Sequence, residues 1–217
     1  MTTTHTHHGH TPSALLTTLL STITSSIIPL TTDAVARGCK VFGASILSKR
    51  TLEPIISSTN DEITSPLLHG EVATLLAFHK HNARLPAEQR VNPKDCIFLS
   101  THEPCSLCLS AITWSGFDNF YYLFTYRDTM DTFAIPHDIQ ILQQVFQTHK
   151  HDGNDELYNR ENSYWKSYSC QDLIDQCQQA ERHALTEELH SVKAQYNGLS
   201  QTYQLSKASQ TGQIPLN

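Results

Sequence analysis

The sequence LSTHEPCSLCLSAITW, residues 99–114, decides how the middle of this chain folds. An apolar run ends at Ser100, a proline follows at 104, and cysteines stand at 105 and 108. Proline is common in the first turn of a helix, and residues three apart on a helix share one face. The stretch therefore predicts a buried strand over 96–100 and a helix over about 104–114 whose first turn carries both thiols.

The position of the two cysteines indicates a metal site. A helix N-terminus presents free N–H groups and the positive end of its dipole, which favours the thiolate form that binds zinc. The pair alone leaves three interpretations open: a redox pair, a structural zinc site, or half of a catalytic zinc site. A structural site needs four protein ligands, and the further candidates for it are Cys96, His102, His79 and His81.

The stretch PLLHGEV, residues 66–72, favours the catalytic site. Ser-Pro at 65–66 is typical of a helix start, so His69 and Glu71 are expected in a first helical turn. Residues two apart do not share a helix face, so His69 is predicted to bind the metal and Glu71 to act on water beside it. Three protein ligands and one open position are the composition of a catalytic zinc site, and the predicted ligands are His69, Cys105 and Cys108.

Together these motifs resemble the signature of the cytidine deaminase superfamily, His-x-Glu followed by Pro-Cys-x-x-Cys. The chain reads His69-Gly70-Glu71 and later Pro104-Cys105-Ser106-Leu107-Cys108, and the resemblance covers roughly residues 33–147. The central glycine is similar to fungal cytosine deaminase, whereas many relatives carry alanine there. Glu-Pro-Cys-x-x-Cys is similar to the tRNA adenosine and guanine deaminases.

The resemblance implies a zinc-dependent hydrolytic deaminase of an aminated nucleobase, nucleoside or nucleotide. Zinc would activate a water molecule, and Glu71 would transfer protons to the ring nitrogen and the leaving ammonia. It also implies substrate contacts from the Asn60 side chain, the Gly70 N–H and the Glu103 backbone carbonyl. Weaker candidates for contact with the base are Asp128, Asp131 and His137. Relatives of the free-base and tRNA branches imply a homodimer.

The motif likeness and the net charge together rank the expected substrates. Cytosine-type substrates are expected first, because of the His-Gly-Glu likeness and the net charge of -6. Guanine-like or pterin-like rings come second. A tRNA adenosine deaminase comes third, because a nucleic-acid-binding protein usually carries a basic face and this chain has only 15 Lys and Arg residues. A noncatalytic zinc-stabilised partner subunit is a further alternative, and the intact Glu71 argues against it. Six dispersed cysteines predict reduced thiols and a cytoplasmic location, with the nucleus as a further compartment.

The order of elements predicts an α/β fold. Strands are expected over 40–48, 53–59, 96–100 and 119–126, and helices from 65 onward, over 104–114 and over 137–147, with loops over 82–95 and 127–136. This alternation, read with the resemblance, predicts a three-layer α/β/α cytidine-deaminase-like sandwich, with a mixed sheet and helices on both faces.

Three segments are expected along the chain. Residues 1–30 form a flexible polar tail and a helix over about 14–30, too short and hydroxylated to span a membrane, and a separate short helix follows over 33–39. Residues 31–151 form the deaminase domain. Residues 152–217 form an extension with a lid over 158–168, a helix and a disordered last dozen residues. The helix carries an apolar seam that packs on the core or forms a coiled coil, made of Leu185, Leu189, Val192, Tyr196, Leu199 and Tyr203.

Overall fold

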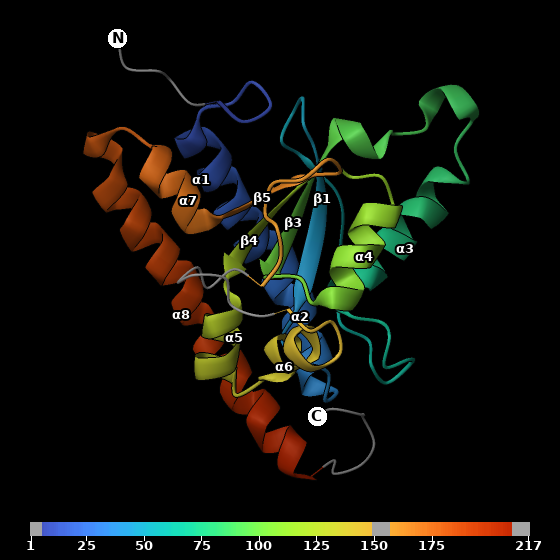
Figure 1. The fold of residues 1–217 in the computed structure, drawn as a ribbon, viewed down its shortest axis with the longest axis vertical. Coiled ribbons are helices and arrows are strands. Elements are labelled where there is room, and N and C mark those ends of the chain that lie inside the picture. The colour runs from blue at the N-terminus through green and yellow to red at the C-terminus, as the bar shows by residue number, and fades with distance from the viewer. Residues whose placement is uncertain (1–5, 149–156, 210–217) are drawn as a thin grey trace.

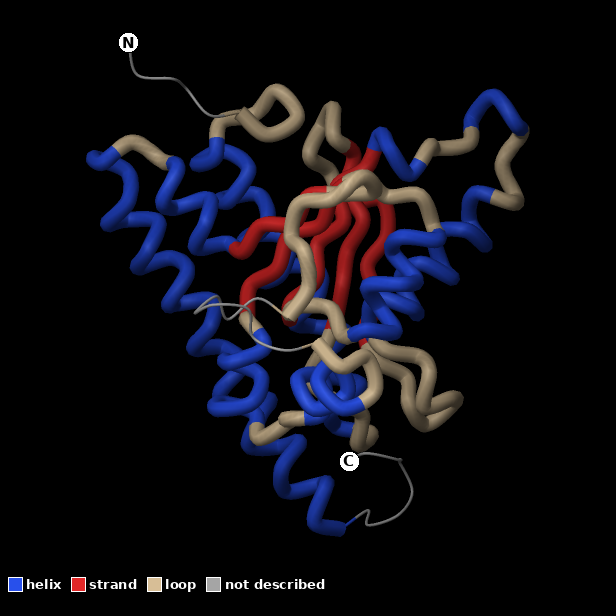
Figure 2. The backbone as a smooth tube through the Cα atoms, in the orientation of Figure 1, coloured by secondary structure: helices blue, strands red, loops and turns tan. Residues whose placement is uncertain are grey.

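A five-stranded sheet forms the middle layer of the protein in the computed structural model, which describes residues 6–148 and 157–209. The strands are β1 (Gly43–Ser48), β2 (Pro54–Thr59), β3 (Cys96–His102), β4 (Asn119–Phe124) and β5 (Lys166–Ser169), in the order β2-β1-β3-β4-β5. β1 pairs antiparallel with β2 and β3, whereas β3, β4 and β5 run parallel. Figures 1 and 2 show helices on both faces. The predicted three-layer α/β/α sandwich with a mixed sheet is confirmed.

Alternate residues of the strands belong to two hydrophobic cores, as the two-residue repeat of a strand requires. Phe98 and Phe120 pack with α3 (Gly70–Asn82) and α4 (Ser106–Trp114) on one face. Leu99 and Tyr121 belong to the core of the other face. That face is covered by α1 (Pro12–Thr22), α2 (Ile28–Ala36), α7 (Cys170–Gln176) and α8 (Gln179–Ser209), as Figure 1 shows. The sheet therefore places α3 and α4 together on one face, away from the four helices of the other face.

The N-terminal helix is longer than the sequence predicted. A π-helical turn over Ile23–Ile27 joins α1 to α2, so the expected separate helix over 33–39 is wrong. Pro29 has no N–H to continue the regular ladder, and the π-turn before it accommodates this without a break. By length and composition Pro12–Ala36 is apolar enough to cross a membrane, yet seven of its apolar side chains, Leu15 among them, pack in the core beneath the sheet. That the protein does not associate with a membrane stays a prediction.

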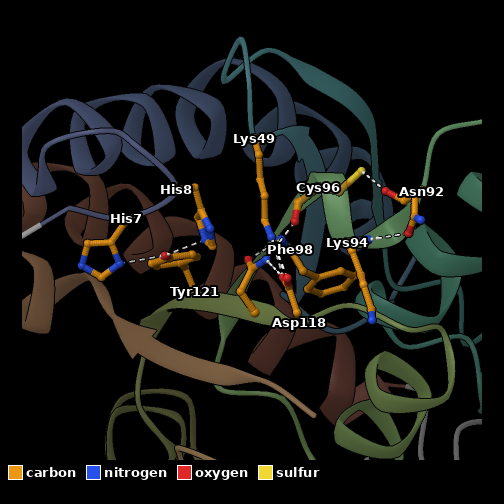
Figure 3. Close-up of polar contacts among 10 residues, drawn as sticks. His7, His8, Lys49, Asn92, Lys94, Cys96, Phe98, Asp118 and Tyr121 are labelled. Atoms are coloured by element: carbon orange, nitrogen blue, oxygen red, sulfur yellow. Dashed lines mark hydrogen bonds and ion pairs between the residues drawn. The ribbon is translucent and has the colours of Figure 1, made fainter. Parts of the chain in front are cut away.

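The histidine-rich segment before α1 is a turn docked on the sheet. His7 Nε2 donates to Gln176 Oε1 at 2.8 Å, and His7 Nδ1 accepts from the Tyr121 hydroxyl at 2.9 Å. His8 Nε2 lies 3.2 Å from the same phenol, and Figure 3 shows both rings directed at it. Beside them in the same view, Lys49 pairs with Asp118 at 2.6 Å. The expected flexible tail is therefore wrong for residues 6–10, because their rings find buried partners.

A helix replaces the loop predicted over 127–136. α5 spans Tyr126–Phe133 and begins with a capping box, in which the Thr125 hydroxyl accepts from the Asp128 N–H and the Asp128 carboxylate accepts from the Thr125 N–H. Ala134 ends it in the left-handed conformation. α6 spans His137–Gln144, close to the predicted helix over 137–147. In the predicted loop over 82–95, the backbone forms 3₁₀ turns at Ala87–Gln89 and Pro93–Asp95.

The C-terminal extension completes the sheet. β5 was not predicted, and it takes the last part of the expected lid over 158–168 into the sheet, so the lid is wrong there. Trp165, just before β5, is buried and donates from Nε1 to Thr113 Oγ1 at 2.8 Å. The α8 seam packs on the chain's own core, which decides against the coiled coil. Residues 210–217 of the expected disordered tail lie outside the described residues. The division at residues 30 and 151 stays a prediction.

Candidate metal centre and active site

Two helix starts meet at one end of the sheet. His69 is the N-cap of α3 and Cys105 is the N-cap of α4. The predicted helix start at 65–66 is wrong, because Asp61 N–H donates to the Leu68 carbonyl at 2.9 Å and closes a turn over these residues. α3 therefore begins at Gly70, with His69 in an extended conformation that leaves its ring free to face α4.

The three predicted ligands come together with the spacing of a zinc site. His69 Nδ1 lies 3.4 Å from Cys105 Sγ and 3.6 Å from Cys108 Sγ. Zinc bonds of about 2.3 Å to sulfur and 2.0–2.1 Å to nitrogen, arranged as a tetrahedron, separate such atoms by about 3.6 Å. Within the described residues, this is the one group of three or more metal-binding side chains. These three side chains would hold a zinc ion as its three protein ligands.

The three predicted ligands shift one another's pKa values. A hydrogen bond from the Cys108 thiol and the nearby His69 ring hold the pKa of Cys105 well below its usual range, although burial opposes this. Burial raises the pKa of Cys108 well above its usual range. Burial lowers the pKa of His69, but the hydrogen bond and charge of Cys105 outweigh it and raise that pKa to about 9. Zinc binding therefore displaces protons from the site.

Glu71 lies beside the ligands without belonging to them. It is the second residue of α3 and only 4% exposed. Ser100 Oγ donates to its Oε1 at 3.0 Å, and Cys108 Sγ to its Oε2 at 3.3 Å. Burial raises the pKa of this carboxyl. A raised pKa suits a group that takes up and releases a proton near neutral pH.

Residues 23–124, which hold all of these side chains, match the family model of the cytidine and deoxycytidylate deaminase zinc-binding region. Residues 23–124 belong to the cytidine deaminase superfamily. The predicted class of enzyme, a zinc-dependent hydrolytic deaminase, is confirmed at this level, and so is zinc as its cofactor. No curated protein matches the sequence.

Solved structures similar to this deaminase include guanine deaminases of two bacteria. The Nitrosomonas europaea enzyme is 17% identical, with 77% of this chain and 81% of that chain covered and a TM-score of 0.42. The Bacillus subtilis enzyme is 22% identical, with 62% and 80% covered and a TM-score of 0.45. A tRNA:A34 deaminase is also 22% identical, with 45% and 71% covered and a TM-score of 0.36. These likenesses are too distant to carry a substrate to this chain.

The other histidines and the cysteine weighed as zinc ligands do not join the group of three ligands. His102 lines the cavity beside that group, but its ring stacks on Phe124 and packs edge-on against Phe133. Cys96 Sγ donates to the Asn92 carbonyl at the far end of β3. The last turn of α3 carries His79 and His81. The structural zinc site with four protein ligands therefore has no fourth ligand among the described residues.

Gly70 is required by close packing. A Cβ atom at this position would lie 2.7 Å from the Cα and 2.9 Å from the N of Gly43, at the start of β1. Both atoms are backbone and cannot move aside as a side chain would. The central glycine of His-Gly-Glu therefore has a structural explanation in this chain, the direct contact of α3 with the sheet.

Two of the predicted substrate contacts, Asn60 and Gly70, hydrogen-bond to each other, and the side chain of Glu103 has its own partners inside the protein. The Gly70 N–H donates to Asn60 Oδ1 at 2.5 Å, and Asn60 Nδ2 donates to Glu62 Oε1 at 2.6 Å. The Glu103 carboxylate accepts from the Tyr126 N–H and the Tyr158 hydroxyl, both at 2.8 Å. Burial raises the pKa of Glu103, and these two donors oppose the rise. Contacts of Asn60, Gly70 and the Glu103 carbonyl with a substrate stay predictions.

Asp138, on α6, is the acidic residue that sequence reasoning missed. It lines a cavity beside the metal ligands, together with Phe42, His69, Glu71, His102, Glu103 and Cys105. Burial raises its pKa to about 8, and the negative charges of Cys105 and Glu71 add to the rise. The cavity measures about 10 Å³, room for roughly one water molecule.

The weaker acidic candidates have other positions. Asp128 caps α5 and pairs with Lys193 at 3.0 Å, and Asp131 is exposed. His137 is the first residue of α6, directly before Asp138. An acidic residue in the first turn of a predicted helix was the signal for Asp138, but it usually indicates only a favourable helix dipole.

Proposed function

We propose that this protein deaminates a free guanine-type base by hydrolysis. The proposal rests chiefly on Asp138, an acidic residue of α6 that lines the cavity beside the metal ligands. In guanine the 2-amino group stands next to the N1–H, so a single carboxylate accepts two hydrogen bonds from that edge. Cytosine offers only its 4-amino group there, since the neighbouring ring atom carries a C–H. The acceptor on α6 therefore matches guanine better.

Two further observations support this ranking over the cytosine-first expectation. The glycine of His-Gly-Glu is explained by its contact with Gly43, so its likeness to cytosine deaminase carries no information on the substrate. The net charge of -6 favours a free base over a nucleotide or an RNA loop. A cytosine-type base remains the second candidate, because the zinc ligands and Glu71 serve either ring.

In the proposed hydrolysis, zinc, Glu71 and Ser100 have separate roles. Zinc supplies the Lewis acidity that makes a water nucleophilic near neutral pH. Once Cys108 has lost its proton to metal binding, Glu71 Oε2 is free to accept a proton from that water. Ser100 holds the other carboxylate oxygen, so Glu71 would keep its orientation while it passes one proton of the water to the ring nitrogen and the second to the amino group, which leaves as ammonia. A bound metal cation also favours the ionised form of Asp138.

An ammonia-release screen of the zinc-loaded protein tests the function, with guanine, cytosine, cytidine, dCMP and adenosine as substrates. Guanine is expected to be turned over with the highest kcat/KM. Glu71→Gln is expected to keep its zinc and to lose about 10²- to 10⁴-fold in kcat, the usual contribution of a general base. Zinc binding without turnover of any base contradicts the proposal and supports the noncatalytic partner subunit.

Asp138→Asn tests the preference for guanine. The asparagine amide keeps one accepting oxygen and replaces the other with an NH2 group that only donates. The variant is therefore expected to raise KM for guanine by about tenfold or more while its zinc content stays unchanged. Asp131→Asn is the matched control, because it removes the same charge from an exposed position on the neighbouring helix. An equal loss in both variants would assign the effect to charge and remove Asp138 from substrate recognition.

A further inference from the structure

A buried chain of polar contacts lies behind the zinc ligand His69. Asn60 accepts from the Gly70 N–H and donates to Glu62 Oε1, as described above. Glu62 Oε2 accepts from the Lys40 N–H at 3.2 Å, and Lys40 Nζ lies 3.7 Å from Glu62 Oε1. Asn60, Glu62 and Lys40 are all buried. We call these three residues the support triad.

The start of α3 explains what the support triad does. The first N–H groups of a helix have no partner within the helix, and the side chain of the N-cap residue normally accepts from one of them. Here the N-cap is His69, whose ring faces the two thiols and makes no capping hydrogen bond within the described residues. Asn60, next to the end of β2, accepts from the Gly70 N–H, which is one of these unpartnered groups. The start of α3 is thereby tied to Asn60 while the His69 ring is directed at the thiols.

Glu62 determines which way the Asn60 amide points. A carboxylate oxygen only accepts, so the Nδ2 side of Asn60 must face Glu62 and the Oδ1 side must face Gly70. Lys40 in turn balances the buried charge of Glu62, which would be unfavourable alone. Lys40 therefore stabilises the charge of Glu62, and Glu62 fixes the orientation of the Asn60 amide.

We propose that Glu62, balanced by Lys40, is a positioning residue of the metal centre. It holds Asn60 as the cap of α3, and through that cap it holds His69 and Glu71 against the two cysteines of α4. Asn60 accordingly supports the zinc site in place of binding the base. The inference deepens the proposed function and rests on the same zinc site, but its metal measurements do not require that guanine is the substrate.

Cobalt substitution tests the triad, because the visible bands of Co²⁺ report the identity and geometry of its ligands. Glu62→Gln and Asn60→Ala are expected to shift these bands and to weaken metal binding about 10- to 100-fold, as measured by competition with a chelator. Asp61→Asn is the matched control, since it removes one negative charge next to Glu62, and it is expected to behave as wild type. A wild-type spectrum and affinity for Glu62→Gln would overturn the proposal, and so would an equal effect of Asp61→Asn.

Steady-state kinetics separate the two roles of Asn60. A positioning role predicts that Glu62→Gln and Asn60→Ala lower kcat more than they raise KM. If Asn60→Ala raises KM and keeps the wild-type cobalt spectrum, Asn60 is a substrate contact and the proposal is wrong. If wild type turns over no base, the proposed function fails, while the cobalt measurements still decide the positioning role.

Wild-type protein provides a measurement that needs no variant to fold. The Gly70 amide is expected to exchange its hydrogen slowly in the zinc-loaded protein, because it donates to a buried acceptor. Its protection is expected to persist when a substrate analogue is added. Exchange at the rate of an exposed amide would show that the cap is not formed, and would overturn the proposal independently of any substitution.

Discussion

Gly70→Ala is the most informative single substitution in this deaminase, because many relatives carry alanine at the same motif position. In this chain the added Cβ would lie 2.7 Å from Gly43 Cα. Carbon atoms in contact are normally about 3.5 Å apart, so α3 or β1 must move by roughly 0.8 Å. Metal ligands tolerate errors of only about 0.2 Å in their distances. The displacement therefore reaches the zinc site through His69, the residue directly before Gly70.

The expected loss is measurable in two assays. Overpacking of this kind lowers the free energy of unfolding by about 1–3 kcal/mol. For a domain of this size that corresponds to a fall of roughly 2–12 °C in Tm, read by differential scanning calorimetry. Zinc affinity, measured by competition with a chromophoric chelator, is expected to fall at least tenfold, within the usual range for a disturbed ligand environment.

Gly198→Ala is the matched control. Gly198 lies in α8, and a Cβ there has no neighbour within 4 Å. This variant is expected to raise the free energy of unfolding by about 0.5–1 kcal/mol, since alanine favours helix, and to leave zinc affinity unchanged. If Gly70→Ala binds zinc as wild type does and its Tm lies within about 1 °C, the close contact does not limit the site and the reasoning is refuted.

Three further predictions concern zinc, the histidine turn and the C-terminal extension. Removing zinc with a chelator is expected to lower the free energy of unfolding by about 2.7 kcal/mol relative to protein at zinc 100-fold above Kd, and an unchanged Tm would contradict a metal link between α3 and α4. Burial, with the nearby Lys49 charge, lowers the pKa of His8 to about 4. The unfolded chain therefore takes up a proton at His8 between about pH 6.5 and 4 that the folded chain does not, so stability falls as pH decreases through this window. His8→Ala should reduce that slope in urea unfolding series, and an identical slope would contradict the assignment. Tyr158→Phe removes a donor from the buried Glu103 carboxylate and is expected to lower the free energy of unfolding by about 1–3 kcal/mol. Tyr164→Phe, at a residue 68% exposed, should change Tm little. Equal Tm values for the two variants would contradict a stabilising role of the Tyr158 hydroxyl.

The chemistry of the metal site followed from short, local patterns. His69 with Glu71, and Pro104 with the two cysteines, each occupy a single helix start. Spacing and helix-end electrostatics act within one turn, so the sequence carries them directly. The capping box of α5 was also a local signal, in the Thr-x-x-Asp at 125–128, and it was overlooked in favour of a loop.

Other elements depended on neighbours distant in the chain. β5 is a short strand of mostly polar residues, Lys-Ser-Tyr-Ser, and it exists because β4 offers it a parallel partner. The histidine turn at 6–10 looked like a solvated tail, and its rings are ordered by Tyr121 and Gln176. No pattern within either segment records these partners.

By itself, the sequence determined which residues form the candidate zinc site, which carboxylate lies beside them, and that strands and helices alternate into a three-layer fold. Tertiary structure alone decided that two helix starts, with ligands 36 residues apart, meet at 3.4 Å, that Gly43 leaves room only for glycine at 70, and that Asp138 reaches the site from α6. The physical reason is the range of the interactions. Helix starts and ligand spacing are set by neighbouring residues, whereas close packing and buried charge depend on surfaces that exist only once the chain has folded.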